Sequence, residues 1–329
     1  MLYPLSFRPL ALPRVWGGSY IARHFHPEFP ESKNIGESWE LSGLEDHVSE
    51  VAAGFLEGNE INELIEVYMG DLVGDTVFQK FGCEFPLLVK FLDINDYLSV
   101  QVHPNDALAG KRHQAYGKAE AWYVLHAEPD ARIYMGFNRP MNPQEFLRRC
   151  QNNSLPETLH CFTPQAGDYF YIPPGTVHAA GGGLVIAEIQ QVSDITYRVY
   201  DWGREYIPQA AREMHLDLAL DAIQWEAIDI PQPIARAQGR QELVDSPYFR
   251  LVRHGLSTAL TLSSPANDSF RILICTQGSV DVVSKDDEGK ALSQRLNPGG
   301  LLLVPACIPQ VQIQPLKENS ELLEAYIAN

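Results

Sequence analysis

Short apolar runs separated by turn residues dominate the hydrophobic pattern of this chain. FPLLVKFLDI (85–94) is typical of a strand buried on both faces, and LSVQVH (98–103) alternates with period two. Three further segments are rich in aromatic and β-favouring residues, namely EAWYVLH (120–126), RIYMGF (132–137) and DYFYIP (168–173), and residues 184–202 predict two more strands. The pattern therefore predicts a mainly β protein.

A few helices interrupt these strands. After Asn59, the apolar residues Ile61, Leu64, Ile65 and Tyr68 share one helical face. Asn105 is placed to cap a short helix over 106–115, and Asn142 precedes a proline in the N-cap arrangement of another helix. Residues 208–224 are also predicted to be helical.

The second half of the chain contains short strands only, which leads us to expect two domains. Three prolines among polar residues predict a linker at 229–247, between an N-terminal domain (1–228) and a C-terminal domain (248–329). Many short strands joined by turns predict jelly rolls. We therefore expect two jelly-roll β-barrels with a few added helices, the second barrel being degenerate.

A weak internal repeat supports the idea of a degenerate second barrel. In the first half Gly167 is followed after five residues by Pro173, and Gly299 and Pro305 keep the same spacing in the second half. Within this frame, Cys307 and Gln310 stand where the first half has Gly175 and His178. The second barrel is therefore expected to lack a metal-binding histidine.

Composition and charge limit the classes of function that this chain could have. Hydrophobic residues make up 45% of the chain, enough for a packed core, and the net charge of −17 argues against partners such as nucleic acid or an anionic membrane. The five cysteines form no CxxC pair, which favours a reducing compartment. The N-terminus is interrupted by prolines and resembles neither a secretion signal nor a membrane span, so we expect a cytoplasmic protein.

A metal site is the clearest chemical signal. G-x5-P-x-G-x2-H at 167–178 matches the second motif of the cupin superfamily, and its last residue is His178. The two predicted jelly-roll β-barrels are therefore expected to be of the cupin type. Upstream, Gln101 and His103 lie on one face of a predicted strand, and Glu120 opens the next aromatic strand. Two imidazoles with oxygen donors and no thiolate suit Zn²⁺, Mn²⁺, Fe²⁺ or Co²⁺. The eight other histidines lack such a context and are interpreted as structural or surface residues.

Several segments, in order along about the first 210 residues, resemble type I mannose-6-phosphate isomerases. They are VWGG (15–18), GESWELSG (36–43), SVQVHPND (99–106), KAEAWYVL (118–125), IPPGTVHAAGGG (172–183) and EIQQVSDITYRVYDWGR (188–204). Only 57 residues separate Glu120 from His178, which leaves no room for the large helical insertion of the longer eukaryotic enzymes. The chain therefore resembles the short bacterial form.

The resemblance implies one zinc ion per chain and a small phosphorylated sugar as the binding partner. It assigns Gln101, His103, Glu120 and His178 as the metal ligands, and it places Arg198, Lys118, Glu188 and Asp194 at the catalytic centre. Ser99, Lys90, Trp16 and Glu37 match substrate-binding positions. Some of these residues also have a structural interpretation. Lys118 and Asp194 could be ordinary surface charges, and Arg198 could belong to a buried ion pair. Trp16 and Trp39 could be core aromatics.

The implied activity is the interconversion of mannose 6-phosphate and fructose 6-phosphate, by metal-assisted proton transfer through an enediol-type intermediate. The candidate bases are Glu188, Asp194, Lys118 and a metal-bound water. Two other classes share the ligand types, namely an Fe²⁺-dependent cupin oxygenase and a non-catalytic sugar-binding or regulatory cupin. The sequence does not indicate an oligomeric state.

Overall fold

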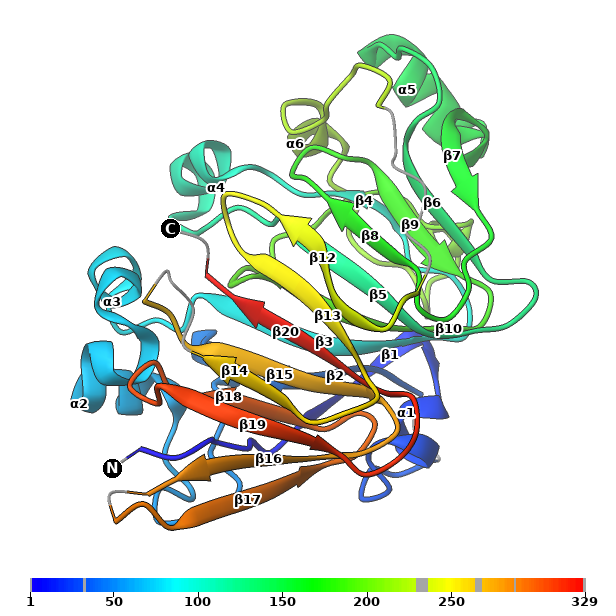
Figure 1. Ribbon diagram of the computed structural model, residues 1–329. Helices are drawn as coiled ribbons and strands as arrows, with labels where there is room; N and C mark the ends of the chain where they lie inside the picture. Colours follow the sequence, from blue (N-terminus) through cyan, green and yellow to red (C-terminus); the bar gives the residue numbers. More distant parts are fainter. Residues whose placement is uncertain (1, 32–33, 229–235, 264–267, 287, 328–329) are drawn as a thin grey trace.

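The computed structural model describes residues 2–31, 34–228, 236–263, 268–286 and 288–327, and it is mainly β, as the sequence predicts (Figure 1). In the N-terminal half, two sheets have the strand orders β1-β2-β3-β10-β5-β8 and β11-β4-β9-β6-β7. Their strands are β1 Leu10–Gly18, β2 Ile35–Leu41, β3 Leu87–Ile94, β4 Val100–Val102, β5 Glu120–Ala127, β6 Arg132–Phe137, β7 Leu159–Phe162, β8 Tyr169–Ile172, β9 His178–Gly181, β10 Leu184–Gln191 and β11 Tyr197–Tyr200.

The C-terminal half forms two further antiparallel sheets, with the orders β12-β13-β20-β15-β18 and β14-β19-β16-β17. Their strands are β12 Gly239–Asp245, β13 Arg250–Leu256, β14 Leu260–Ser263, β15 Arg271–Gln277, β16 Val280–Lys285, β17 Ala291–Leu296, β18 Leu301–Val304, β19 Gln310–Pro315 and β20 Ser320–Tyr326. An apolar cluster that includes Leu273, Val282 and Ile313 fills the space between them. Each half is thus a pair of sheets packed face to face.

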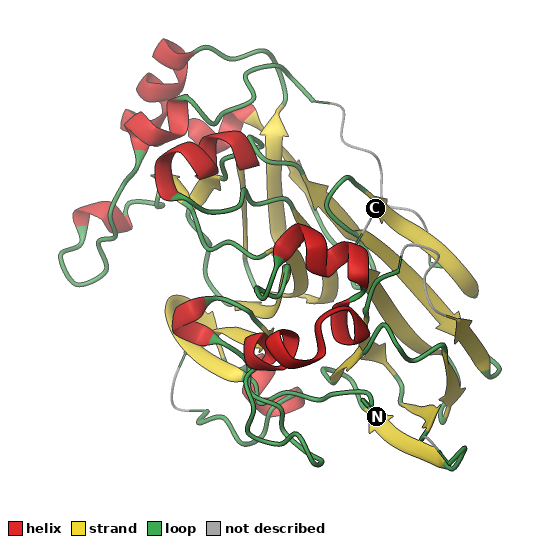
Figure 2. Ribbon diagram, turned by 90° about the vertical axis from the view of Figure 1, so that its left-hand side faces the viewer, coloured by secondary structure: helices red, strands yellow, loops and turns green. Residues whose placement is uncertain are grey.

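The helices are short and lie outside the layers of strands (Figure 2). They are α1 Tyr20–His24, α2 Ile61–Val73, α3 Asp75–Phe81, α4 Asp106–His113, α5 Pro143–Gln151 and α6 Leu216–Leu220, with 3₁₀ turns at Glu45–His47, Leu155–Thr158 and Arg204–Tyr206. No helix in the described ranges is long and apolar enough to cross a membrane.

The central strands β3 and β10 are buried along their whole length, because apolar layers cover both of their faces. Val89 and Ala187 face a core that also contains residues of the C-terminal half, whereas Leu92 and Ile186 face the interior of the N-terminal sandwich. This two-sided burial explains the continuous apolar run at 85–94. It also directs every second side chain of these strands toward the interior of the sandwich.

Several sequence predictions are confirmed and others need correction. Asn105 and Asn142 cap α4 and α5 through their side chains, as predicted. The sheets, in contrast, do not close into barrels: each ends in edge strands, so the jelly rolls are sandwiches. The helix predicted at 208–224 is wrong except for α6: residues 208–210, which begin with Pro208, form a turn, and residues 211–215 have no regular structure and bond to β11 through His215.

The repeat and the linker can be placed on this fold. Gly167 and Gly299 both adopt positive φ, and each precedes a strand–turn–strand unit, β8–β9 and β18–β19 respectively. Residues 229–235 of the predicted linker lie outside the described residues, and its remainder contains β12. The division into domains at this linker stays a prediction.

Candidate metal centre and active site

The site begins with a row of polar side chains across the shorter N-terminal sheet. Gln101 on β4 pairs directly with His178 on β9, and Arg198 on β11 pairs with Gln101 from the other side. Side chains of directly paired residues point to the same face of a sheet. The strand register therefore places an amide, an imidazole and a guanidinium side by side.

The opposite sheet contributes charged groups to the same interior. Glu188 on β10 pairs with Lys90 on β3 and with Trp122 on β5. Lys90 and Glu188 share the strand face of Leu92 and Ile186, which belong to the apolar interior of the sandwich. The interior of the sandwich therefore changes from apolar to charged at these residues.

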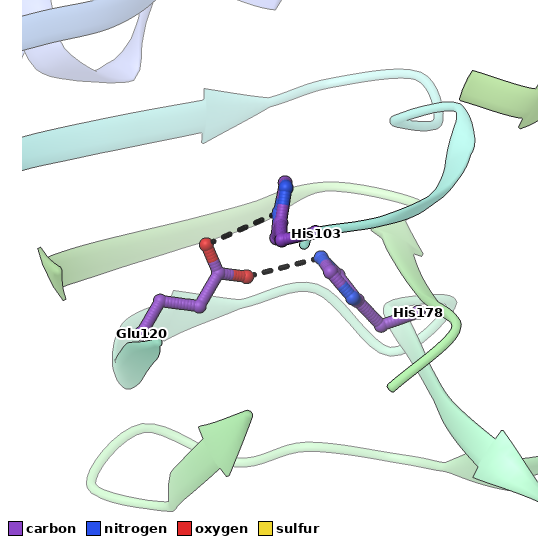
Figure 3. A group of neighbouring side chains, drawn as sticks. All are labelled: His103, Glu120 and His178. Atoms are coloured by element: carbon purple, nitrogen blue, oxygen red, sulfur yellow. Dashed lines mark ion pairs between the residues drawn. The ribbon is translucent and has the colours of Figure 1, made fainter. Parts of the chain in front are cut away.

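His103, Glu120 and His178 form a compact, buried group, with ligand atoms that all lie within 4.8 Å of one another (Figure 3). Glu120 Oε1 lies 3.0 Å from His178 Nε2, and Glu120 Oε2 lies 3.5 Å from His103 Nε2. In the described part of the chain, this is the one such group of histidine, cysteine or acidic residues.

The hydrogen bonds of the two imidazoles fit this group to a metal ion. His103 Nδ1 donates to the carbonyl of Ile195 and His178 Nδ1 donates to the carbonyl of Thr176, both at 2.8 Å. Because a carbonyl only accepts, each neutral ring presents an unprotonated Nε2 to Glu120. Two nitrogen lone pairs and a carboxylate facing one another repel, and a cation between them removes the repulsion.

Burial supports the same assignment. Within the described residues, His103 Nε2 and both oxygens of Glu120 are buried and make no hydrogen bond. Burial and the charge of Lys118 hold the pKa of His103 well below its usual value, so the ring stays neutral. Burial raises the pKa of Glu120, but the nearby charge of Lys118 opposes this effect, and the pKa is held well below its usual value. Neutral imidazoles and an ionised carboxylate are the forms that bind metals.

Gln101 joins this group through its side-chain amide. Its Nε2 lies 3.2 Å from His178 Nε2. Turning the amide by 180° exchanges its nitrogen and oxygen, which places an oxygen donor at the same point. The donor set of two nitrogens, a carboxylate and an amide oxygen is one that Zn²⁺ and similar divalent ions accept.

A lysine lies between two buried carboxylates beside the metal group. Lys118 Nζ lies 3.2 Å from Glu120 Oε2 and 3.4 Å from Glu188 Oε1. Burial lowers the pKa of Lys118, but the charges of Glu188 and Glu120 outweigh it and raise this pKa. Burial also raises the pKa of Glu188. Lys118 is therefore a permanent cation, whereas Glu188 is the carboxylate that protonates more readily.

A cavity of about 430 Å³ opens beside these groups. It is lined by Leu12, Arg14, Trp16, Glu37, Trp39, His47, Lys90, Leu92, Leu98, Ser99, Gln101, Lys118, Glu188, Asp194, Thr196, Arg198 and Arg212. All eight residues that the sequence predicts for catalysis or substrate binding are among them. His103, Glu120 and His178 lie behind Gln101 and Lys118.

One wall of the cavity is an ion-pair network around Glu37. Arg14 donates two hydrogen bonds of 3.0 Å to the Glu37 carboxylate, and Trp39 Nε1 donates a third of 2.7 Å. Lys90 Nζ lies 4.0 Å from Glu37 and 4.5 Å from the centre of the Trp39 ring. Burial raises the pKa of Glu37, but Lys90 and Arg14 lower it to about 2. The network therefore stays ionised at neutral pH.

The opposite wall is cationic. Arg198 Nε donates to Ser99 Oγ at 3.2 Å, and Arg198 Nη1 donates to the carbonyl of Glu213 at 2.7 Å. Arg212 also lines this wall. Burial and the nearby charge of Arg212 lower the pKa of Arg198.

Sequence reasoning did not identify Arg14, His47 or Arg212 as site residues, and it interpreted Trp39 as a core aromatic. Of these residues, Arg14 is the one that could have been found from the sequence, because it directly precedes the VWGG segment that resembles the family. His47 lies in a 3₁₀ turn beside the Trp39 ring, where no motif marks it. Arg212 lies in the segment that was predicted as a helix, so the direction of its side chain could not be predicted.

Comparison with known proteins agrees with this geometry. A family model described as the catalytic domain of type I phosphomannose isomerase matches residues 12–135. A mannose-6-phosphate isomerase of Streptococcus mutans is 33% identical over 288 residues, covering 86% of this chain and 88% of that protein. One from Bacillus subtilis is 34% identical over 289 residues, covering 85% and 88% respectively.

Solved structures give the same result. The crystal structure of the mannose 6-phosphate isomerase from Bacillus subtilis superimposes with a TM-score of 0.84 and 28% identity, and the match covers 99% of this chain and 100% of that one. Fold and site together thus define a cupin-type protein with a buried group of two histidines and one carboxylate that could hold a metal ion. The chain belongs to the type I phosphomannose isomerase family.

Proposed function

We propose that this protein is an aldose–ketose isomerase that interconverts mannose 6-phosphate and fructose 6-phosphate. The supporting observation is a cavity that is lined by a buried lysine–glutamate pair and a cationic wall, and that lies beside the His103–Glu120–His178 group through Gln101 and Lys118. The names of its relatives agree with this activity. We also propose a cytoplasmic location, which is supported by the free thiols of Cys83, Cys150, Cys161 and Cys275.

The metal of this proposal is one zinc ion per chain, held by Gln101, His103, Glu120 and His178. When bound there, a divalent ion supplies a Lewis acid that polarises the oxygen atoms of the sugar. Mn²⁺, Fe²⁺ and Co²⁺ also suit these donors. The neutral imidazoles and the amide leave most of the ion's charge in place, because Glu120 alone carries a negative charge.

The two walls of the cavity have separate roles in substrate binding. Arg198 and the hydroxyl of Ser99 bind the phosphate, since both are donors on the cationic wall. The charge of Lys90 is already balanced by that of Glu37, so we assign these two residues to binding the sugar hydroxyls. The Trp16 side chain, only 2% exposed, is part of the apolar lining.

Glu188 is the proposed base. As a carboxylate, it takes the proton from C2 of the aldose and returns it to C1, while one hydroxyl proton passes from O2 to O1, so that the enediol closes to the ketose. Its burial and raised pKa favour such two-way transfer. Lys118 stays protonated and stabilises the negative charge that develops on the sugar oxygens. Asp194 is exposed, and we place it at the entrance of the cavity.

The decisive experiment is a coupled isomerase assay on mannose 6-phosphate, before and after removal of metal with a chelator. We expect activity that disappears with the chelator and returns with Zn²⁺ or another divalent ion. The His178→Ala variant should lose both bound metal and activity, because it removes one of the two imidazole ligands.

The same assay separates the competing classes. An Fe²⁺-dependent oxygenase would consume oxygen and would be active without isomerising the sugar phosphate. A non-catalytic sugar-binding protein would bind the ligand without turnover. Metal-replete protein that fails to isomerise mannose 6-phosphate would refute the proposed function.

A further inference from the structure

A segment that the sequence did not assign to the site, residues 207–215, contacts strand β11 at Arg198. The Arg198 amide donates to His215 Nδ1 at 3.1 Å, and the His215 amide donates back to the Arg198 carbonyl at 2.8 Å. Arg198 Nη1 also donates to the carbonyl of Glu213. This segment is therefore attached to both the backbone and the side chain of Arg198.

Within this segment, Arg212 is held rigidly by a buried carboxylate. Arg212 donates from Nε to Asp201 Oδ2 at 3.1 Å and from Nη2 to Asp201 Oδ1 at 2.5 Å. Asp201 has no exposed surface and also accepts two hydrogen bonds from Arg204. A carboxylate that binds two donors of one guanidinium fixes the plane of that group. Arg212 thus lines the cavity in a defined orientation, with its side chain 22% exposed.

Each of the two guanidiniums has one terminal nitrogen that is available to a ligand. Among the described residues, no hydrogen bond involves Arg198 Nη2 or Arg212 Nη1. The Ser99 hydroxyl accepts from Arg198 and can still donate its own hydrogen. Three donors on the cationic wall are therefore free to bind one anion.

The charges around these donors also favour an anion. Arg204 and Arg212 share one buried carboxylate, Asp201, and Arg198 lines the cavity together with Arg212. The other acidic groups are less buried: the Glu213 side chain is 85% exposed, the Asp96 side chain is 57% exposed and paired with Arg204, and Asp194 is exposed at the cavity. Like charges held together in this way repel until an anion neutralises them.

We propose that Arg212 is a substrate-binding residue that, with Arg198 and Ser99, forms the subsite for the phosphate group of the substrate. This inference rests on the proposed isomerase function and adds a residue to its site. A phosphate monoester dianion offers three oxygens, which matches two guanidiniums and a hydroxyl. Arg198 is paired with Gln101, so a phosphate bound here directs the sugar carbons toward the metal group.

The test compares Arg212→Ala and Arg212→Lys with the wild-type holoenzyme, using two inhibitors that differ only in the phosphate: sorbitol 6-phosphate and sorbitol. In Arg212→Ala, we expect KM for mannose 6-phosphate and Ki for sorbitol 6-phosphate to rise about thirtyfold or more. The Ki for sorbitol and kcat should change by less than about threefold. Arg212→Lys, which keeps the charge but not the planar fork, should lie between the two. Arg139→Ala, at an exposed pair with Glu145, is the matched control.

Two results would overturn this inference. One is a folded, metal-replete Arg212→Ala protein with wild-type KM and Ki. The other is an equal loss of affinity for sorbitol and sorbitol 6-phosphate, which would show that Arg212 only holds the 207–215 segment in place. Titration with inorganic phosphate tests the subsite without turnover. If the wild type bound phosphate through Arg212 but did not isomerise the sugar, the proposed function would fail and the anion subsite would stand.

Discussion

Lys118 lies between two buried carboxylates, and its charge therefore affects both the metal group and the proposed base. It is 3.2 Å from Glu120 and 3.4 Å from Glu188, and only 5% of its surface is exposed. A lysine side chain buried to this extent keeps its charge only when acidic groups surround it. The same two carboxylates favour the protonated form of Lys118, which argues against this lysine as the base.

Replacing Lys118 with methionine should separate metal binding from catalysis. The change removes a cation beside Glu120 but no ligand, so bound metal should stay at one ion per chain. The charge that stabilises the developing oxyanion is lost, and kcat should fall by about a hundredfold or more. Metal analysis and the coupled assay measure both quantities. Lys118→Arg, the charge-conserving control, should lose less, and unchanged kcat in Lys118→Met would contradict the assigned role.

Glu37 should make the stability of the protein depend on pH. Its pKa is about 2 in the folded protein and 4.5 ordinarily, so its stabilising effect is complete above pH 4.5 and is lost as the pH falls toward 2. At pH 7, Glu37→Gln should lower the free energy of unfolding by at most about 3 kcal/mol, and this difference should shrink below pH 4.5. Urea unfolding of both proteins between pH 7 and pH 3 measures it.

The control for this measurement is Glu57→Gln, which removes an exposed partner of Arg8. Surface ion pairs contribute about 0–1 kcal/mol, so this variant should match the wild type closely at every pH. A Glu37→Gln deficit that stays constant from pH 7 to pH 3 would show that the carboxylate acts through packing and not through its charge.

At the scale of single residues, most residues that line the cavity could be predicted from the sequence, because they occur in motifs. Ser99, Glu188 and Arg198 lie in segments that resemble the family, and the strand register brings them to one cavity. Arg14 and Arg212 were missed: Arg14 lies just outside the VWGG segment, and the orientations of both side chains depend on the partners Glu37 and Asp201, which lie on other segments. No local pattern encodes such a pairing.

At the scale of elements, a single glycine turn positions two of the proposed metal ligands. Gly175, in the turn between β8 and β9, has φ +88°, its amide donates to the carbonyl of His103 at 2.9 Å, and its carbonyl accepts from Gln224. His178 begins the next strand. In the second half Cys307 takes the place of Gly175, and it is not among the residues with positive φ. The two turns therefore differ in conformation as well as in ligands.

Gly175→Ala should destabilise the protein and loosen the metal. A Cβ at this position would lie 2.8 Å from the carbonyl oxygen of Ala222, in addition to the cost of a positive φ. Gly58→Ala is the matched control, because Gly58 has φ +84° with no atom within 4 Å of the added Cβ. We expect about 1–2 kcal/mol for Gly58→Ala and at least about 1 kcal/mol more for Gly175→Ala.

Thermal unfolding and metal titration check this difference. Gly175→Ala should also bind metal more weakly than Gly58→Ala, since the turn holds both His103 and His178. Equal stability of the two variants would mean that the turn shifts freely. Equal metal affinity would mean that it does not position the ligands.

Elements with local signals were the ones that could be predicted. The caps of α4 and α5 are set by Asn105 and Asn142 within a few residues of each helix start, so the sequence revealed them. The segment 207–215 has a helical pattern, yet its hydrogen bonds to Arg198 override that preference. The open edges of the sheets also carry no sequence signal, because closure depends on how distant strands pair.

At the scale of the whole molecule, the two halves share one hydrophobic core. The cluster that contains Phe91 and Ala187 continues through Leu251 and Leu303 of the C-terminal half. Leu5 exchanges two backbone hydrogen bonds of 2.8 Å with Leu303, so the N-terminal segment pairs with a C-terminal strand. Figure 1 shows the strands of the C-terminal half alongside the N-terminal segment. The second sandwich is therefore expected to be part of the folding unit that holds the metal.

All five tryptophans (Trp16, Trp39, Trp122, Trp202 and Trp225) lie in the N-terminal half, which gives each half a separate signal. Tryptophan fluorescence reports on the first half only, whereas far-ultraviolet circular dichroism reports on the strands of both. Because the core is shared, the two signals should give one coincident thermal transition. A chelator should shift that whole transition to lower temperature, since bound metal stabilises only the folded state.

Leu303→Ala tests whether the two halves unfold together, because Leu303 lies in the half that contains no proposed metal ligand. Leu303 has no exposed surface, and its truncation should cost about 2–5 kcal/mol. Both signals should then move together to lower temperature, although every tryptophan is in the other half. Leu316→Ala, at a side chain that is 44% exposed, is the control and should leave both transitions unchanged. A dichroism transition that separates from the fluorescence transition and ignores the chelator would instead establish two independent domains.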